Sequence, residues 1–303
     1  MKSSNLITIF TPTYNRATLL GRLYDSLINQ SFNNFEWIIV DDGSSDNTEE
    51  VVQTFLKEDK LAITYVKQQN SGKHIAINTG LDHAQGEWFF IVDSDDYLIP
   101  DALKIVNEYL AKNTTYNYDG FAFRRAYEGG TSIGGEFPEG IQEFAATIIE
   151  RTVKYRVSGD MAEVFKTDLL RECKFDEGFN EKFCAEGLML NRTAKLGAKL
   201  LYIDQYIYIC EYLPGGLTDN SVGNRRRSPK YATMVYKELA EVRSLPIKYK
   251  LKAYSNYWRF SFFINCSWYE KIRNINGSFL GLISLPFGYI MKLKDDFNLK
   301  KIK

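Results

Sequence analysis

The chain has 303 residues, 45% of them hydrophobic, so it can bury the core of one large domain or of two small ones. Lysine and arginine together number 38, as do aspartate and glutamate, and this zero formal net charge argues against a nucleic-acid-binding protein. The four cysteines lie far apart and form no CxxC pair, which argues against a disulfide framework or a zinc site. The N-terminus shows no signal-peptide pattern, and no stretch reaches the roughly 18 apolar residues of a membrane span, so we expect a cytoplasmic location.

The first third of the chain alternates between strand and helix patterns. Continuous apolar runs predict strands at residues 6–11, 35–40, 62–66 and 88–92. Periodic apolar residues predict helices at residues 19–28, 75–84 and 101–110. A further helix is predicted to begin at Asp46, which has the position of an N-cap because Glu49 follows three residues later. Since the strands do not alternate and helices separate them, we predict a mostly parallel sheet with helices on both faces.

The rest of the chain is less regular. We expect glycine-rich loops and edge strands at residues 119–150 and a helix at residues 182–196. A strand is expected at residues 202–210 and a polar loop at residues 212–230. The residues that follow are helical in pattern, aromatic and basic. We therefore predict an α/β domain at residues 1–225 and a helical extension at residues 226–303.

Three of the predicted strands end in unusual polar segments. The first runs into Pro12-Thr13-Tyr14-Asn15-Arg16, the second into Asp41-Asp42-Gly43-Ser44-Ser45, and the fourth into Asp93-Ser94-Asp95-Asp96. In an open parallel sheet, the carboxyl ends of the strands meet at one edge, where ligands bind. The three segments are therefore predicted to lie together.

The acidic segment after the fourth strand is a candidate metal site. Asp93, Asp95 and Asp96 place three carboxylates within four residues, and such an arrangement costs stability unless a cation or strong donors neutralise it. Hard oxygen ligands of this kind suit Mg²⁺ or Mn²⁺, which complete their shells with substrate phosphates. The alternative from the residues alone is a solvated acidic turn that begins the next helix.

Other polar residues at the strand ends are candidates for nucleotide binding. Asp41 and Asp42 can accept hydrogen bonds from a ribose hydroxyl or a base N–H, although Gly43 makes an ordinary acidic turn an equal alternative. Tyr14 offers an aromatic face to a base. Lys73 can meet a diphosphate, or it can be an ordinary surface lysine.

In order and spacing, these motifs resemble the family 2 glycosyltransferases with the GT-A fold. The resemblance rests on residues 12–16, 40–48, 70–73 and 93–96, and it covers roughly the first 110 residues. It implies a Rossmann-like domain with a nucleotide-binding half at about residues 1–115 and an acceptor half at about 116–225. It also implies inverting transfer of a sugar from a nucleotide-diphosphate sugar, foremost a UDP-sugar, to a glycan or lipid-linked acceptor.

The resemblance assigns roles to the candidate residues. Nucleotide-sugar binding falls to Pro12, Tyr14, Arg16, Asp41, Asp42, Lys73, Asp93 and Ser94. The metal ion, Mn²⁺ or Mg²⁺, falls to Asp95, supported by Asp93 and Asp96. The family's general base is an aspartate that follows a glutamate and precedes an arginine by six residues. Here Ala185-Glu186 and Arg192 stand in that register, so Glu186 is the candidate base, or alternatively a helix-capping carboxylate.

Two later segments also bear on function. Residues 211–218, with Arg225–Arg227, are similar to a subset of the family and predict either a loop that closes over a diphosphate or a basic surface loop. Residues 279–291 are apolar and precede lysines at 292, 294, 300, 301 and 303. This pattern predicts either an interfacial segment on the inner face of the cell membrane or a helix docked on the domain by its apolar face.

Two other functions are compatible with these motifs. The first is a degenerate transferase that binds a nucleotide-sugar without turnover, which Ala185 and Gly187 beside the candidate base make conceivable. The second is a sugar nucleotidyltransferase, which shares the fold class but needs an early glycine-rich segment that residues 6–21 lack.

Overall fold

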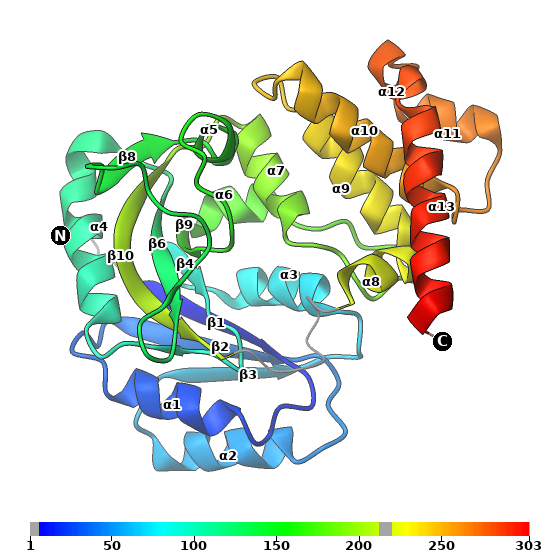
Figure 1. Cartoon of the computed structure of the whole chain (residues 1–303). Coiled ribbons are helices and arrows are strands. Elements are labelled where there is room, and N and C mark those ends of the chain that lie inside the picture. The colour runs from blue at the N-terminus through cyan, green and yellow to red at the C-terminus, as the bar shows by residue number, and fades with distance from the viewer. Residues whose placement is uncertain (1–5, 212–219, 303) are drawn as a thin grey trace. The chain divides into compact units, whose positions relative to one another are not determined.

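The computed structural model describes residues 6–211 and 220–302 (Figure 1). The chain divides into two compact units, the first formed by Met1–Lys174 and Gly197–Leu213 and the second by Phe175–Leu196 and Pro214–Lys303. These units do not follow the predicted division at residue 225. The reason is that helix α7 (Gly187–Lys195) packs on α9 (Pro229–Glu241), where the Asn191 side chain donates to the Val235 carbonyl at 2.9 Å.

The first unit is built on one mixed sheet. Its strands are β1 Ile7–Thr13, β2 Phe35–Asp41, β3 Ile63–Lys67, β4 Trp88–Ile91, β5 Tyr97–Leu98, β6 Gly120–Tyr127, β7 Ser132–Ile133, β8 Glu143–Ala146, β9 Ala162–Lys166 and β10 Leu200–Cys210. Its helices are α1 Leu20–Ile28, α2 Thr48–Glu58, α3 Lys73–His83, α4 Ala102–Tyr116, α5 Ile148–Val153 and α6 Thr167–Glu172. The predicted α/β class is confirmed.

The strand order is β3-β2-β1-β4-β9-β6-β10-β5. The first four strands are parallel, as their unalternating apolar sequences predict. β9 then pairs antiparallel with both β4 and β6, and β10 pairs parallel with β6. In register, Thr13 lies opposite Asp41, and Asp41 opposite Lys67, so the ends of β1, β2 and β3 coincide at one edge.

Helices cover both faces of the parallel half of the sheet (Figure 1). On one face, Tyr24 of α1 stacks on Phe55 of α2 with ring centroids 4.1 Å apart, and both rings lie against Trp37 of β2. On the other face, α3 lies so close to β1 that a Cβ atom at Gly80 would stand 2.3 Å from the Phe10 ring. β1 and β2 are consequently buried along their whole length.

Two predicted helix boundaries differ in the structure. α2 begins at Thr48 with Asn47 at the N-cap position, not at Asp46. The Asp46 carboxylate accepts from the Thr48 amide at 3.0 Å and from the Ala17 amide at 3.1 Å, so it joins two loops instead of capping the helix. The predicted loop at 212–230 is also wrong in its described part, because Ser221–Arg227 forms helix α8 and Pro229 begins α9.

The second unit is helical. Besides α7, α8 and α9 it contains α10 Ile247–Ser261, α11 Trp268–Asn274, α12 Phe279–Ile283 and α13 Leu285–Ile302. Aromatic side chains of α10 form its core, where Tyr257 and Trp258 are almost fully buried. The Trp258 indole donates to the Gly281 carbonyl at 2.7 Å and so fixes α12 to α10. No helix in the described part of either unit is long and apolar enough to cross a membrane.

Candidate active site

The turn after β1 and the loop after β2 are joined by a set of short hydrogen bonds. Asn15 adopts a left-handed conformation (φ 53°), and its side-chain oxygen accepts from the Ser45 amide at 2.8 Å. Its own amide donates to the Ser44 hydroxyl at 2.8 Å, and the Arg16 amide donates to the Thr48 hydroxyl at 3.1 Å. Tyr14 lies on this joined segment with 48% of its surface exposed, which leaves its ring available for stacking.

Asp41 and Asp42 are both buried and bonded to the protein. The Asp41 carboxylate accepts from the Ser44 amide at 2.7 Å and from the Tyr65 hydroxyl at 2.8 Å. Burial and this carboxylate raise the pKa of Tyr65. The Asp42 carboxylate accepts from the Gln68 side chain and the Ser71 amide at 2.8 Å and from the Gly72 amide at 2.7 Å. Asp42 therefore holds the loop that precedes Lys73.

Gly43 makes this arrangement possible. Its φ of +81° lies in the left-handed region, and a Cβ atom there would stand 2.9 Å from the Asn70 amide nitrogen and 3.2 Å from the Gln68 carbonyl oxygen. Any other residue would strain the backbone and push the 68–72 loop away from Asp42. The Asp-Gly step in the sequence thus has a packing reason in addition to its turn conformation.

The end of β4 brings acidic and basic residues together. The Lys73 ammonium lies 2.6 Å from the Asp93 carboxylate, and the Arg16 guanidinium lies 3.9 Å from that of Asp95. Both carboxylates remain partly accessible, with 25% and 27% of their side-chain surface exposed. Burial alone would raise the pKa of Asp93, but the charges of Lys73 and Arg125 outweigh it and leave that pKa below its ordinary value.

Asp96 differs from the other two acidic residues of this segment. One of its oxygens accepts from the Tyr208 hydroxyl at 2.8 Å and the other from the Glu211 amide at 3.1 Å. The same Tyr208 hydroxyl accepts from the Asp93 amide at 2.9 Å, so it links both ends of the acidic segment to β10. Burial, followed by the charge of Asp93, raises the pKa of Asp96 to about 6. Burial and Asp93 likewise raise the pKa of Asp95.

Two arginines that the sequence reasoning missed support this segment. The Arg125 guanidinium lies 4.3 Å from the centre of the Tyr208 ring and donates to the Met161 carbonyl at 2.9 Å. Arg22 donates to the Asp95 carbonyl at 2.8 Å and lies over the Tyr97 ring. For Arg125 a signal was available, because an Arg-Arg pair inside an otherwise apolar strand needs buried partners.

The predicted binding residues thus fall into two groups. Tyr14, Arg16, Lys73, Asp93 and Asp95 have side chains that are exposed or only partly buried. Pro12, Asp41, Asp42, Ser94 and Asp96 are buried. The first group can contact a ligand directly, whereas the second shapes the loops around it.

A divalent cation fits only part of the predicted ligand set. Over residues 6–211 and 220–302, no three or more His, Cys, Asp or Glu side chains converge in a metal-binding arrangement. Mg²⁺ and Mn²⁺ nevertheless bind with one or two protein carboxylates when substrate phosphates and water complete their shell. Asp93 and Asp95 suit that role, since both are accessible and the raised pKa of Asp95 reflects a charge that a cation would relieve.

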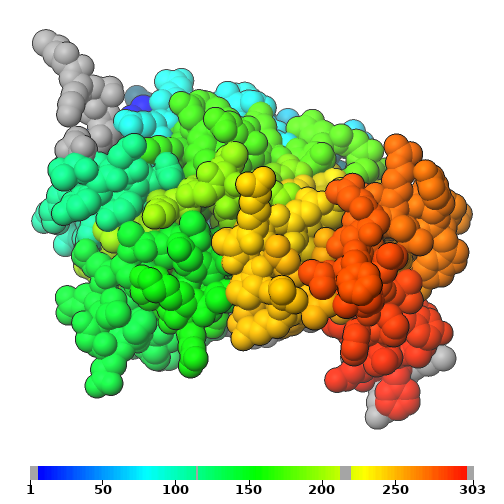
Figure 2. All heavy atoms as spheres, turned by 90° about the horizontal axis from the view of Figure 1, so that it is seen from above, coloured from blue at the N-terminus to red at the C-terminus, as the bar shows by residue number. Residues whose placement is uncertain are grey.

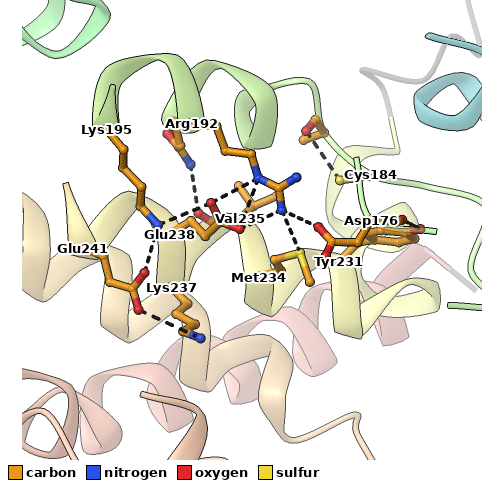
Figure 3. A network of polar contacts seen from close by, with 12 residues as sticks. Asp176, Cys184, Arg192, Lys195, Tyr231, Met234, Val235, Lys237, Glu238 and Glu241 are labelled. Carbon is orange, nitrogen blue, oxygen red and sulfur yellow. Dashed lines mark hydrogen bonds and ion pairs between the residues drawn. The ribbon is translucent and has the colours of Figure 1, made fainter. Parts of the chain in front are cut away.

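The candidate base and its neighbours lie in the second unit. Glu186 is the partly buried N-cap residue of α7, and its side chain makes no capping hydrogen bond. Arg192, on the same helix, points between Asp176 and Glu238 and donates to both, the latter at 2.8 Å (Figure 3). Burial alone would lower the pKa of Arg192, but these two acids raise it. Arg192 therefore ties α7 to α9 and to the segment before α7.

The predicted diphosphate-closing segment is only partly described. Residues 212–218 lie outside the described residues, whereas Arg225–Arg227 form the end of α8. Each of these arginines bonds within its own unit: Arg225 to Ser221, Arg226 to Asp296 at 2.6 Å, and Arg227 to Asn224 at 2.6 Å.

The sequence of the chain is similar to those of known proteins. The family model for glycosyl transferase family 2 matches residues 8–167. The GalNAc(5)-diNAcBac-PP-undecaprenol beta-1,3-glucosyltransferase of Campylobacter jejuni is 32% identical over 176 residues, which are 57% of this chain and 55% of that protein. The chain spans between 31% and 55% of the length of the first two curated relatives.

Solved structures give the same fold. TarS 1–349 of S. aureus in complex with UDP-GlcNAc superimposes with a TM-score of 0.65 at 20% identity, covering 89% of this chain and 78% of that one. The mannosyltransferase PcManGT of Pyrobaculum calidifontis, in complex with GDP-Man and Mn²⁺, gives a TM-score of 0.55 at 18% identity, with coverages of 95% and 87%. The predicted GT-A fold is confirmed.

Proposed function

The chain belongs to glycosyl transferase family 2, and from that premise we propose that it is an inverting glycosyltransferase that uses a nucleotide-diphosphate sugar. The observation that carries the proposal is the pairing of Lys73 with Asp93 and of Arg16 with Asp95 at the strand ends of the first unit. The two basic side chains can bind a diphosphate, and the two accessible carboxylates can bind the metal ion that accompanies it. The TarS structure in complex with UDP-GlcNAc favours a UDP-sugar as donor.

The donor-binding residues divide by accessibility. Tyr14 stacks on the base, while Arg16 and Lys73 balance the charge of the diphosphate. Asp41 and Asp42 act mainly by holding the loops that surround the nucleoside, because their carboxylates already accept two and three protein hydrogen bonds. Pro12 and Ser94, both buried, shape the walls of the site.

We assign the divalent cation to Asp95 with Asp93, and we give Asp96 the role of positioning this acidic segment. When bound, Mn²⁺ or Mg²⁺ supplies charge neutralisation for the departing diphosphate. The complex of the PcManGT structure with Mn²⁺ supports metal use. Asp96 is less available to a cation, because one of its oxygens accepts from Tyr208 of β10 and the other accepts from the amide of Glu211, the residue after β10.

In the proposed reaction, the acceptor hydroxyl oxygen attacks the anomeric carbon and the Glu186 carboxylate takes its proton. The new C–O bond forms as the bond to the diphosphate breaks, so the anomeric configuration inverts. The place of Glu186 in the family's register supports its assignment as the base, with Ala185 as the departure.

The acceptor is proposed to be a glycan or a lipid-linked glycan, in polysaccharide or glycolipid synthesis. The name of the Campylobacter relative specifies a glycan on PP-undecaprenol. Such an acceptor places the enzyme in the cytoplasm and peripherally at the inner face of the cell membrane.

The proposal is tested by a thermal-shift panel of UDP-, GDP- and dTDP-sugars, each with Mn²⁺ and then with EDTA. A ligand that binds only the native state increases the free energy of unfolding, by about 2.7 kcal/mol at a ligand concentration one hundred times Kd. The melting temperature rises as a result. We expect a metal-dependent shift with one nucleotide class. A shift without turnover on any acceptor pool would instead identify a degenerate binding module, and no shift at all would refute the donor site.

A further inference from the structure

Helix α13 is held to its unit by a small residue and by acidic side chains. At Gly288 a Cβ atom would stand 2.5 Å from the Trp258 Cβ and 2.6 Å from the Ser255 carbonyl oxygen, so α13 and α10 touch backbone to backbone. Further along, both oxygens of Asp295 accept from Arg259 at 2.6 Å. The next residue, Asp296, accepts from Arg226 at 2.6 Å.

The opposite face of α13 is apolar and uncovered. Phe287, Ile290, Leu293 and Phe297 follow one another at spacings of three or four residues, so they share one side of the helix. Their exposed fractions are 62%, 62%, 45% and 60%. In α12, Phe279, Leu282 and Ile283 are exposed as well, at 74%, 39% and 42%. We call these seven side chains the outer face; α12 and α13 lie at the surface in Figure 2, in orange to red.

This orientation contradicts the prediction that the segment is a helix docked on the domain by its apolar face. A helix docked by its apolar side would bury Phe287, Ile290 and Phe297, and it would turn its aspartates to water. Here the aspartates are turned inward and the aromatic residues outward. Exposed apolar side chains gathered on one side of a helix in this way mark a site of interaction with a membrane or another protein.

The charges around the outer face select between these partners. Residues 268–303 contain seven lysines and arginines but only three acidic residues. Two of those three are Asp295 and Asp296, whose charges are paired with arginines of the same unit. Lys294 is exposed and, by helical spacing, lies on the outer face between Ile290 and Phe297. Apolar side chains with a cation among them, and with acidic groups withdrawn, complement an anionic bilayer surface.

We propose that the outer face of α12 and α13 docks on an anionic lipid bilayer, with α13 lying in the plane of the interface. Phe287, Ile290 and Phe297 insert among the lipid chains, while Lys294 meets the headgroups. No described helix is able to cross the bilayer, so the contact is peripheral. The inference rests on contacts within the second unit and is independent of the proposed transferase activity.

The test is flotation of the full chain with vesicles of phosphatidylcholine alone or with about 30% phosphatidylglycerol, which gives the surface a negative potential. We expect binding to the anionic vesicles and little to the neutral ones. The triple variant Phe287→Ser, Ile290→Ser, Phe297→Ser should reduce the bound fraction at least about tenfold, because each residue gives up buried apolar area.

A matched control makes the same change elsewhere. Tyr116, Leu196 and Ile247 are exposed to 67%, 56% and 65%, so Tyr116→Ser, Leu196→Ser, Ile247→Ser removes similar exposed apolar surface without touching the outer face. This control should bind like the wild type, and both variants should keep the wild-type melting temperature within a few degrees. No flotation of the wild type, or equal flotation of both variants, would overturn the proposal. A wild-type dimer that the outer-face variant alone converts to a monomer, without vesicle binding, would assign the face to a second copy instead.

Discussion

At the strand ends of the first unit and on helix α13 of the second unit, carboxylates are bonded to other protein groups in a similar way, but the exposed side chains beside them have opposite chemistry. At the strand ends, Asp42 and Asp96 accept protein hydrogen bonds, and the accessible residues beside them are charged. On α13, Asp295 and Asp296 accept from arginines, and the accessible residues are apolar. In both regions the bonded acids hold the local structure in place, and the exposed residues show what each surface is suited to contact.

The largest effect is expected at the accessible carboxylates. Replacing Asp95 by alanine should lower kcat/KM by at least about 10³-fold, or about 4 kcal/mol, because the cation and the departing diphosphate lose their neutralising partner. The melting temperature should stay near that of the wild type, since the Asp95 side chain is partly exposed and its ion pair with Arg16 is long, at 3.9 Å. Steady-state kinetics and thermal melts measure both effects, with Glu50→Ala on the exposed side of α2 as control. Near-normal turnover of Asp95→Ala would show that the strand ends do not hold a catalytic cation.

In the second unit, Glu186→Gln should slow transfer by about 10²- to 10³-fold while leaving the donor-induced thermal shift unchanged. The amide keeps the size of the side chain but cannot take the proton of the acceptor. Glu177→Gln, an exposed change on the preceding segment, serves as the control and should be silent. Equal activity of the two variants would remove Glu186 from the mechanism.

Buried polar groups of the first unit should also make its stability depend on pH. Burial lowers the pKa of His74 from 6.5 to about 4, so between these values the unfolded chain binds more protons than the folded one. Stability should therefore fall by up to about 3 kcal/mol as the pH drops from 6.5 to 4. Asp96, with its pKa raised to about 6, acts in the opposite direction as the pH falls from 6 towards 4.

His74→Leu isolates the histidine contribution from that of Asp96. Urea unfolding at pH 7 and at pH 4.5 should show a smaller loss of stability for the variant than for the wild type. An identical pH dependence of the two proteins would mean that His74 titrates normally in the folded state.

The smallest effect compares two helical glycines. Gly288→Ala should destabilise the protein by about 1–3 kcal/mol, because the added Cβ meets the backbone of α10. Gly21→Ala in α1 meets nothing within 4 Å and should instead stabilise by about 1 kcal/mol through helix propensity. Thermal unfolding distinguishes the two signs. A neutral or stabilising Gly288→Ala would mean that α13 does not pack tightly on α10.

The parts of the molecule that the sequence predicted well are those with local causes. The strands at β1, β2 and β4 are continuous apolar runs, and a continuous run of this length followed by a turn is itself the signal. The motifs at their ends are short and lie at the same edge because parallel strands put them there. The accessible candidates Lys73 and Asp93 are accordingly found side by side.

The parts that it missed depend on distant partners. Asp42 bonds to residues about thirty positions further on, and Asp96 to β10, more than a hundred positions away. The antiparallel insertion of β9 between β4 and β6 has the same character. In the α13 segment the sequence showed an apolar run followed by lysines, but it did not show which side of the helix packs inward. That side is set by the close contact of Gly288 with α10 and by the arginines that Asp295 and Asp296 meet.

The three hydrogen bonds that Asp42 accepts have a practical consequence for anyone who redesigns the donor preference. Because Asp42 lies in a motif predicted to contact the nucleoside, it is an obvious position to substitute. Its carboxylate, however, also fixes the backbone from Gln68 to Gly72 and therefore the start of α3, where Lys73 lies. A library varied at position 42 would select for variants that keep that loop in place before it could select among bases. Positions such as Tyr14, whose side chain is accessible and whose loop is held by its neighbour Asn15, offer selection without that confounding requirement.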